Sequence, residues 1–367
     1  MVFLRGGCDT LSLTVPYADA FYHDSRPNIA VPAPNADNPL SALRLDDRWG
    51  LHPVLGETLM PLFAKGELAF VPFCGNTHVS RSHFEAQDLI ELAQPAGQRR
   101  DYNVGFLNRL IERLQGGKGD PRGVSFTQQL PLVMKGARSV PNVPAGNTSI
   151  RTLSEARHDA VAALYAGHPL QPVVDEALGT RREIAQALAA EMVESARGAP
   201  LPAGLERSAA GIAGVLRDRP EYSVAFIDVG GWDTHAGQGG GAGFLPNRLG
   251  GLGRALAALR EGLDDQWAKT VVMVMTEFGR TFRENGNRGT DHGHGSTMML
   301  LGGGVRGGLH GEQVALDAAH LHEDRDVPVL NDYRAVLAGV FGDLFGLSAS
   351  DQGYVFPGVA RSRLRLV

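Results

Sequence analysis

The sequence predicts an α/β protein with a mostly parallel central sheet that helices cover on both faces. Its strand-like segments are continuous apolar runs rather than alternating ones, which is typical of strands buried on both faces. Helical patterns alternate with these runs along the chain, as they do where parallel strands are joined by crossover helices. The length of 367 residues suffices for one large domain that carries an insertion.

Five apolar runs are predicted to be strands, and four segments with helical patterns are predicted to be helices. Glycine-rich or polar turns end most of the runs and set their boundaries. The predicted strands are residues 2–4, 67–73, 222–229, 269–276 and 296–303. The predicted helices are residues 52–66, 82–94, 245–265 and 331–347.

Residues 150–218 differ from the rest of the chain. They show helical periodicity, and no strand-like run separates their helical segments. We therefore expect a helical insertion or cap at 150–218. Residues 1–149 and 219–367 are expected to form together the single α/β domain.

The composition limits the classes of function. A hydrophobic content of 43% with 20% charged residues is typical of a soluble globular protein. The net charge of −5 gives no reason to expect nucleic acid as a partner. No run approaches the ~20 apolar residues that a membrane-spanning helix needs, so no membrane span is expected.

Polar side chains gather beside every predicted strand. Parallel α/β sheets bind their ligands beyond the carboxyl ends of the strands, so these side chains are expected to converge on one sheet edge. Asp9 follows the first strand, Ser80, Ser82 and His83 follow the second, Asp233 and His235 follow the third, Glu277 and Arg280 follow the fourth, and Asp291, His292 and His294 precede the fifth.

Two of these groups have the chemistry of metal ligands. The stretches "DTH" (233–235) and "DHGH" (291–294) supply the carboxylate oxygens and imidazoles that Zn²⁺, Mn²⁺ and Fe²⁺ accept. The alternative for Asp233 and His235 is a turn in which the aspartate bonds backbone amides and the histidine is exposed. The alternative for 291–294 is a glycine-rich turn that happens to carry histidines.

The stretch "SRSHFEAQD" (80–88) has two interpretations. Ser82 and Glu85 fit the capping box S-x-x-E, and this spacing favours a serine that only starts the helix. A helix N-terminus also stabilises oxyanions, so a serine there beside a metal is a candidate nucleophile. Ser80 is the competing candidate, and Arg81 is placed to clamp an anionic group.

Glu277 directly follows a buried strand. It is a candidate metal ligand or general base. Its alternative role is a salt bridge to Arg280 or Arg283.

Several motifs resemble the DUF1501 proteins, a family built on a domain of unknown function. These are "FLRGGCDTL", "VPYAD…RPNIAVP", "SRSHFEAQD", "GGWDTHAGQ", the long segment from Thr276 to Gly308, and "LNDYRAVLAGVF". The resemblance covers nearly the whole chain. The family is related to the alkaline phosphatase-like and sulfatase superfamily. The resemblance therefore implies an α/β sheet with one or two metals at the strand ends, and a serine, threonine or formylglycine nucleophile that attacks a phosphate or sulfate ester.

Carried over residue by residue, the resemblance implies roles for the strand-end residues. Ser80 or Ser82 stands in the nucleophile region. The implied metal ligands are Asp9 as the first metal aspartate, Asp233 and His235 as the Asp/His pair of one site, and His292 or His294 as the late metal histidine.

The chain also departs from the superfamily. Glu277 and Phe278 stand where the superfamily usually has Asp-His, which removes an expected imidazole and argues against a complete second metal site. The sulfatase pattern C-x-P-S-R has no equivalent, which argues against a formylglycine-dependent sulfatase.

The leading hypothesis is a metal-dependent hydrolase of phosphate or sulfate esters, with a serine nucleophile at a helix N-terminus and a small anionic ester as substrate. Arg81 or Arg280 would hold the anion. One or two divalent ions, Zn²⁺ or Mn²⁺, would bind Asp9, Asp233, His235, Glu277 and the 291–294 loop.

Two alternatives remain open. One is a catalytically inactive protein of the same fold that acts as a binding or assembly factor in the cell envelope. The other is an α/β protein whose histidine-rich loop is only a turn. Family members often carry a twin-arginine signal, so the resemblance implies an exported or periplasmic protein whose leader precedes this chain; otherwise the protein is expected in the cytoplasm.

Overall fold

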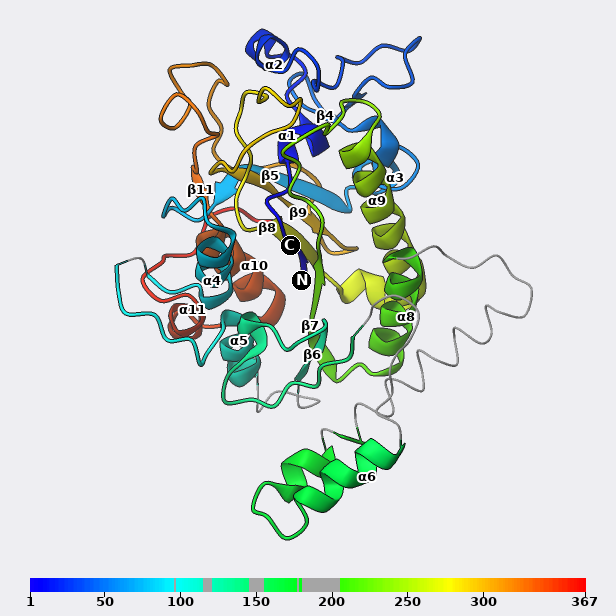
Figure 1. The fold of residues 1–367 in the computed structure, drawn as a ribbon, viewed down its shortest axis with the longest axis vertical. Coiled ribbons are helices and arrows are strands. Elements are labelled where there is room, and N and C mark those ends of the chain that lie inside the picture. Colours follow the sequence, from blue (N-terminus) through cyan, green and yellow to red (C-terminus); the bar gives the residue numbers. More distant parts are fainter. Residues whose placement is uncertain (96, 115–120, 145–154, 177, 180–204) are drawn as a thin grey trace, which may run out of the picture. The chain divides into compact units, whose positions relative to one another are not determined.

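A computed structural model describes residues 1–95, 97–114, 121–144, 155–176, 178–179 and 205–367. The chain divides into two compact units. The first unit contains residues 1–100, 228–254 and 267–367, and the second contains residues 101–227 and 255–266. Figure 1 labels many of the helices and strands of both units.

The strands of the first unit form a mixed sheet in the order β10-β5-β9-β8-β1, and β11 also pairs with β5. Parallel pairs join β1 to β8, β10 to β5 and β11 to β5, whereas β9 is antiparallel to both of its neighbours. The strands are β1 (Val2–Leu4), β5 (Leu68–Gly75), β8 (Val272–Thr276), β9 (Ser296–Leu301), β10 (Gly308–Leu309) and β11 (Asn331–Asp332).

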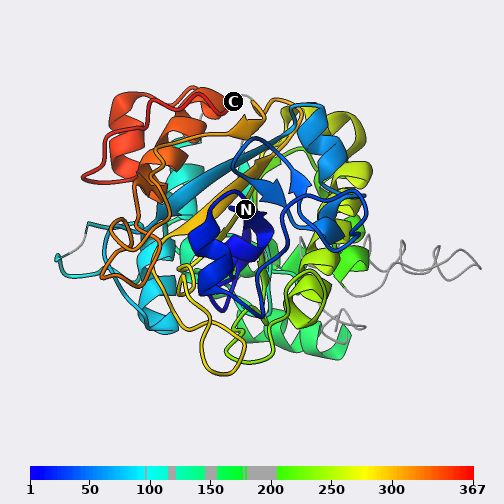
Figure 2. The same cartoon turned by 90° about the horizontal axis from the view of Figure 1, so that it is seen from above.

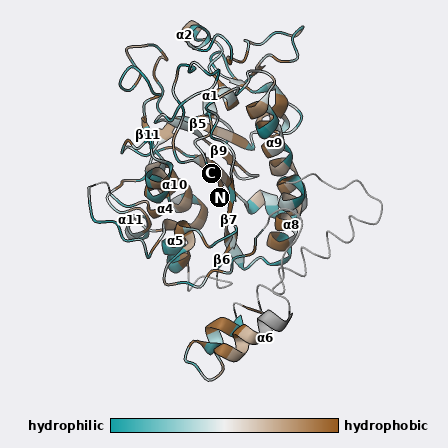
Figure 3. Ribbon diagram, in the orientation of Figure 1, coloured by the Kyte–Doolittle hydropathy of each residue, from teal (hydrophilic) through white to brown (hydrophobic). Residues whose placement is uncertain are grey.

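The prediction of a mixed α/β protein with a mostly parallel central sheet is confirmed. Every residue of β1, β5, β8 and β9 is buried, which explains why these strands are continuous apolar runs. Figure 3 shows apolar colouring along β5 and β9. Strand β9 runs antiparallel because residues 277–295 return from β8 without a crossover helix.

Helices of the first unit follow its strands along the sequence. Helix α4 begins eight residues after β5, and α10 begins directly after β11. In Figure 2 the two C-terminal helices, α10 and α11, lie together. The helices are α1 (Thr10–Leu13), α2 (Ala20–Ser25), α3 (Met60–Ala64), α4 (His83–Leu92), α10 (Tyr333–Phe345), α11 (Ala349–Val355) and the first part of α9 (Phe244–Leu263).

The prediction of one continuous helix over 52–66 was wrong. The structure has a 3₁₀ turn at Pro53–Leu55 and the short helix α3 at Met60–Ala64. Pro61 lies in the first turn of α3, where its missing N–H is tolerated. Further inside a helix the same residue would break the hydrogen-bond pattern, which is why the helical segment cannot run through it.

A small antiparallel sheet in the first unit was not predicted. It consists of β2 (Thr14–Val15), β4 (Gly50–Leu51) and β3 (Leu43–Arg44). Strands of two residues are too short to show the alternation that identifies a strand in a sequence. A buried cluster that includes Tyr22, Trp49 and Phe73 packs in the same region.

The second unit contains the parallel pair β6 (Arg122–Phe126) and β7 (Tyr222–Val229), although the last two residues of β7 belong to the first unit. Strand β6 was not predicted. Part of the predicted helical segment at 150–218, namely residues 150–154, 177 and 180–204, lies outside the described residues. The helices of the second unit include α5 (Phe106–Leu114), α6 (Glu155–Leu164), α8 (Leu205–Asp218) and the 3₁₀ turn at Leu132–Met134.

Within the described part of the chain, the longest helices are too short or too polar to cross a membrane.

Candidate metal centre

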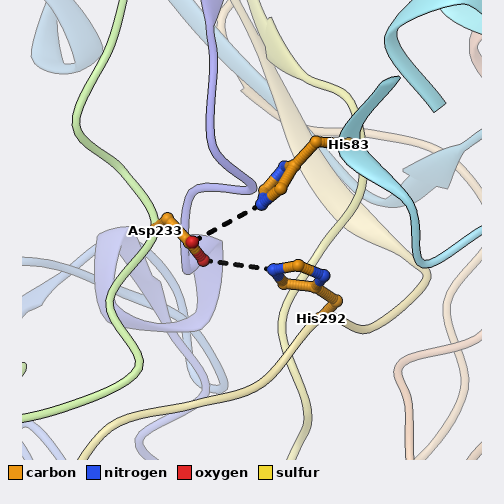
Figure 4. A group of neighbouring side chains, drawn as sticks. All are labelled: His83, Asp233 and His292. Carbon is orange, nitrogen blue, oxygen red and sulfur yellow. Dashed lines mark hydrogen bonds and ion pairs between the residues drawn. The ribbon is translucent and has the colours of Figure 1, made fainter. Parts of the chain in front are cut away.

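Three side chains from distant parts of the first unit meet at one point. His83 comes from the start of α4, Asp233 from the segment after β7, and His292 from the loop before β9. Figure 4 shows both imidazoles directed at the carboxylate of Asp233. One ligand atom of each residue lies within 4.8 Å of the ligand atoms of the other two. We call His83, Asp233, His292 and the adjacent His235 the imidazole cluster.

Alternating burial places Asp233 and His235 on the same side of their segment. Trp232 and Thr234 are buried, with exposed fractions of 1% and 2%. The Thr234 hydroxyl donates to the Gln238 side chain over 2.8 Å, which anchors the segment from beneath. Asp233 and His235 therefore both face outward, and His235 Nε2 lies 2.9 Å from Asp233 Oδ1.

The histidine-rich loop is held by backbone contacts. The amide of Gly279 donates to the carbonyl of His294 over 2.8 Å, and the amide of Thr281 donates to that of Asp291 over 2.9 Å. A Cβ atom at Gly293 would lie 2.5 Å from the carbonyl carbon of Arg280, so only glycine allows the two segments to approach this closely. The glycine beside His292 therefore serves close packing, which positions the imidazole.

His292 presents its Nε2 atom to the cluster. Its Nδ1 lies 2.8 Å from the carbonyl oxygen of Arg81. A carbonyl oxygen only accepts hydrogen bonds, so Nδ1 carries the proton and Nε2 carries a lone pair. That Nε2 lies 3.2 Å from Asp233 Oδ1 and 3.1 Å from His235 Nε2.

His235 and His83 are oriented in the same way by carboxylates. His235 Nδ1 lies 2.9 Å from Asp291 Oδ1, which also accepts from Asn285 over 3.1 Å. His83 Nδ1 lies 2.9 Å from Glu277 Oε1. In both residues Nδ1 donates to an acceptor outside the cluster, and Nε2 is left to face Asp233.

The Nε2 atoms of the imidazole cluster are left without a satisfactory hydrogen-bond partner. The Nε2 atom of His83 is buried without a hydrogen-bond partner, 3.5 Å from Asp233 Oδ2. The Nε2 atoms of His235 and His292 present lone pairs to each other at 3.1 Å. Such lone pairs repel unless a proton or a cation lies between them, so the donor set fits a divalent cation.

At Asp233, Glu277 and His292 the electrostatics favour the protonation states that bind a cation, whereas the hydrogen bond to Glu277 raises the pKa of His83. Burial by itself raises the pKa of Asp233, but the hydrogen bond and charge of Arg280 outweigh it and hold that pKa below its ordinary value. Burial likewise opposes ionisation of Glu277, yet hydrogen bonds from His83 and Gln87 lower its pKa. Burial lowers the pKa of His292. Both carboxylates are thus ionised at neutral pH, and His292 is neutral.

Other residues predicted to be metal ligands lie around the cluster or outside it. Glu277 is fully buried and accepts from His83, Gln87 and the amide of Gly6 over 2.8–3.0 Å. No ion pair to Arg280 or Arg283 is described for it. Glu277 and Asp291 therefore orient imidazoles through their Nδ1 atoms instead of joining the cluster themselves.

Asp9 and His294 are placed elsewhere. Asp9 forms a buried ion pair with Arg26, at 2.6 Å and 3.1 Å, and also accepts from Ser12 and Gln238. His294 lies next to His322, with ring centroids 5.1 Å apart. Burial lowers the pKa of His294 to about 4.

The candidate catalytic residues have structural partners, with one exception. Ser80 donates to Glu85 over 2.8 Å, and Arg81 pairs with Glu323 and Asp326, both at 2.7 Å. Arg280 is fully buried and donates to Asp233 over 2.6 Å. Only Ser82 is exposed with no side-chain hydrogen bond described.

The predicted capping box is not formed. Ser82 does stand at the N-cap position of α4, but its side chain makes no capping hydrogen bond. The expected partner, Glu85, instead accepts from Ser80 and pairs with Arg100. The spacing S-x-x-E located the start of the helix correctly and assigned the wrong role to its carboxylate.

His83 was not predicted to be a ligand. The sequence carried a signal, because His83 follows a predicted strand just as Asp233 and His235 do. The serines and the capping pattern beside it favoured other interpretations. Phe278 packs against the rings of both His83 and His292, at centroid distances of 5.0 Å and 4.9 Å, and these two imidazoles lie 4.2 Å from each other.

The chain belongs to the family described as "Protein of unknown function (DUF1501)", whose sequence model matches residues 1–355. The predicted family membership is thereby confirmed. Comparisons with curated proteins and with solved structures found no match.

Proposed function

We propose that this DUF1501 protein is a metal-dependent hydrolase with one divalent cation held by His83, Asp233, His235 and His292. The observation that carries the proposal is the common orientation of three imidazoles, each directing Nε2 at one carboxylate. Three nitrogen donors and one oxygen donor suit Zn²⁺ best, with Mn²⁺ as the second choice. A cation held there would polarise an ester oxygen and lower the pKa of a bound water.

The proposed substrates are phosphate or sulfate esters, in line with the resemblance to the alkaline phosphatase-like superfamily. Ser82 is the better candidate nucleophile of the two serines. It directly precedes the cluster residue His83, and its side chain is exposed without a described partner. Ser80 is buried, with an exposed fraction of 9% for the residue, and its hydroxyl donates to Glu85. Activation of Ser82 would come from the cluster beside it.

A second candidate function is a non-catalytic binding or assembly role in the cell envelope, after export. Phe278 supports it, because an apolar ring packs against His83 and His292 where the superfamily supplies another metal-binding imidazole. Metal-loaded protein without turnover on either class of ester would favour this function over hydrolysis.

The test combines elemental analysis with ester hydrolysis on the full chain. Wild-type protein is expected to bind one equivalent of Zn²⁺ and to hydrolyse p-nitrophenyl phosphate or p-nitrophenyl sulfate. The variants His83→Ala and His292→Ala are expected to lose both properties. His294→Gln is the matched control in the same loop and is expected to keep the metal. Wild-type protein that remains metal-free after incubation with Zn²⁺ and Mn²⁺ would refute the proposal.

A further inference from the structure

Arg280 and Arg81, the two arginines predicted to hold the anion, are already neutralised by carboxylates. Arg280 pairs with Asp233, and Arg81 pairs with Glu323 and Asp326. Neither guanidinium is free to hold the anionic group of a substrate, contrary to the roles expected from the sequence. A site for an anionic ester therefore needs a different cation.

Arg248, in the second turn of α9, has the required properties. Among the residues that the structure describes, its side chain has no ion pair or hydrogen bond, and the residue is exposed. A Cβ atom at Gly231 would lie 3.0 Å from Cζ and Nη2 of Arg248 and 3.1 Å from Nη1. Because these three distances are nearly equal, the guanidinium presents its face to the position that a Cβ atom of Gly231 would occupy.

The ring of Phe244 is the second contact of this guanidinium, with its centroid 5.3 Å from Cζ. Contacts of this kind use the face of the guanidinium and leave its N–H edges for other partners. Gly231 lies two residues before Asp233 and has a φ of +88°, a conformation that favours glycine. The backbone that supports Arg248 is thus the backbone that positions the cluster carboxylate.

We propose that Arg248 is the specificity-determining residue that binds the anionic phosphate or sulfate group of the substrate. Two edge N–H groups of a preoriented guanidinium match two oxygens of a tetrahedral oxyanion. The inference rests on the proposed function for the substrate class, but it predicts an anion site that is measurable without turnover.

The experiment is calorimetric titration of inorganic phosphate into the Zn²⁺-loaded full chain. Arg248→Ala is expected to weaken phosphate binding ~10- to 100-fold, the range for a lost charge-assisted hydrogen-bonded pair. Arg248→Lys is expected to fall in between, because lysine keeps the charge and loses the planar fork. Arg288→Ala is the matched control: it removes one exposed positive charge from the loop that also carries His292 and is expected to change the affinity by no more than ~2-fold.

Equal affinities in Arg248→Ala and Arg288→Ala, or no phosphate binding by wild-type protein, would overturn the inference. The experiment distinguishes failure of the anion site from failure of the proposed hydrolase function. Phosphate binding that depends on Arg248 in a protein without ester turnover supports the anion site and counts against the hydrolase. Turnover of p-nitrophenyl phosphate with a KM that Arg248→Ala leaves unchanged supports the hydrolase and counts against the anion site.

Discussion

Asp9 and Asp233 both follow a strand in the sequence, but the structure buries one and leaves the other partly exposed. Each follows a strand, and each was predicted to be a metal ligand. Asp9 is buried and paired with the fully buried Arg26. The side chain of Asp233 is 41% exposed and faces the Nε2 atoms of three imidazoles.

Both carboxylates pair with a buried guanidinium, which carries only donors and stays protonated: Asp9 with Arg26 and Asp233 with Arg280. The remaining partners decide the role, because those of Asp9 are the hydrogen-bond donors Ser12 and Gln238, whereas those of Asp233 are imidazoles. A neutral imidazole offers a lone pair, so several of them around one carboxylate require a cation or a proton. Asp9 therefore serves the fold, whereas Asp233 is suited to bind a ligand.

The largest effect is expected when the buried ion pair of Asp9 is removed. Asp9→Asn leaves the Arg26 charge buried and uncompensated, and we expect it to lower the free energy of unfolding by ~3–5 kcal/mol. Urea denaturation of the metal-free protein measures the loss. Asp47→Asn, in the exposed pair with Arg44, is the matched control and is expected to leave the midpoint unchanged. An Asp9→Asn variant of wild-type stability would show that this aspartate is not structural.

At the cluster, a substitution is expected to change stability little and metal affinity strongly. His235→Ala removes a half-exposed imidazole, so the metal-free protein is expected to lose only ~1 kcal/mol of stability. Its affinity for Zn²⁺ is expected to fall by more than the ~10- to 100-fold that loss of an outer partner causes. A competition titration with a chelating dye measures the affinity. An unchanged Zn²⁺ affinity would remove His235 from the ligand set.

A smaller effect on the metal is expected from Glu277→Gln. Glu277 contacts His83 Nδ1, and the amide variant orients the imidazole less strongly and makes it less basic. We expect ~10- to 100-fold weaker Zn²⁺ binding. The exposed Glu323→Gln serves as control. Weakened binding in both variants alike would point to a general charge effect instead of a positioning role.

The smallest predicted effect is a pH dependence whose sign depends on the metal. The hydrogen bond to Glu277 raises the pKa of His83 above 6.5. In the metal-free protein this pair therefore stabilises the fold below pH 6.5 and loses its contribution as the pH rises through the folded-state pKa. Bound Zn²⁺ requires neutral His83, so its stabilisation is expected to weaken as the pH falls.

Thermal unfolding at pH 6 and pH 8, with and without Zn²⁺, measures both signs. Zn²⁺ is expected to raise the Tm more at pH 8 than at pH 6. His83→Gln, compared with wild type without metal, is expected to cost more stability at pH 6. The buried pair of Asp9 provides an internal reference, since Arg26 lowers the pKa of Asp9 against the effect of burial and its contribution persists down to below pH 3.8. Equal Zn²⁺ effects at both pH values would contradict the assigned protonation.

Much of the fold was accessible from local patterns. The apolar runs identified β1, β5, β7, β8 and β9 to within three residues at either end. All of these strands except β7 are buried throughout, which leaves few polar positions in them. The same patterns missed β6 and the two-residue strands, whose pairing is decided by distant neighbours. A proline likewise broke the helix expected over 52–66.

Residue chemistry and position beside predicted strands were enough to propose Asp233, His235 and His292 as ligands, since ligands of such sheets bind at the ends of the strands. The distinction between Asp9 and Asp233 depended on partners that no local pattern identifies. Arg26 reaches Asp9 across 17 positions, and His83 reaches Glu277 across 194. Such pairs exist only once the segments have packed, because the environment that fixes the charge and orientation of a side chain is built by residues distant in sequence.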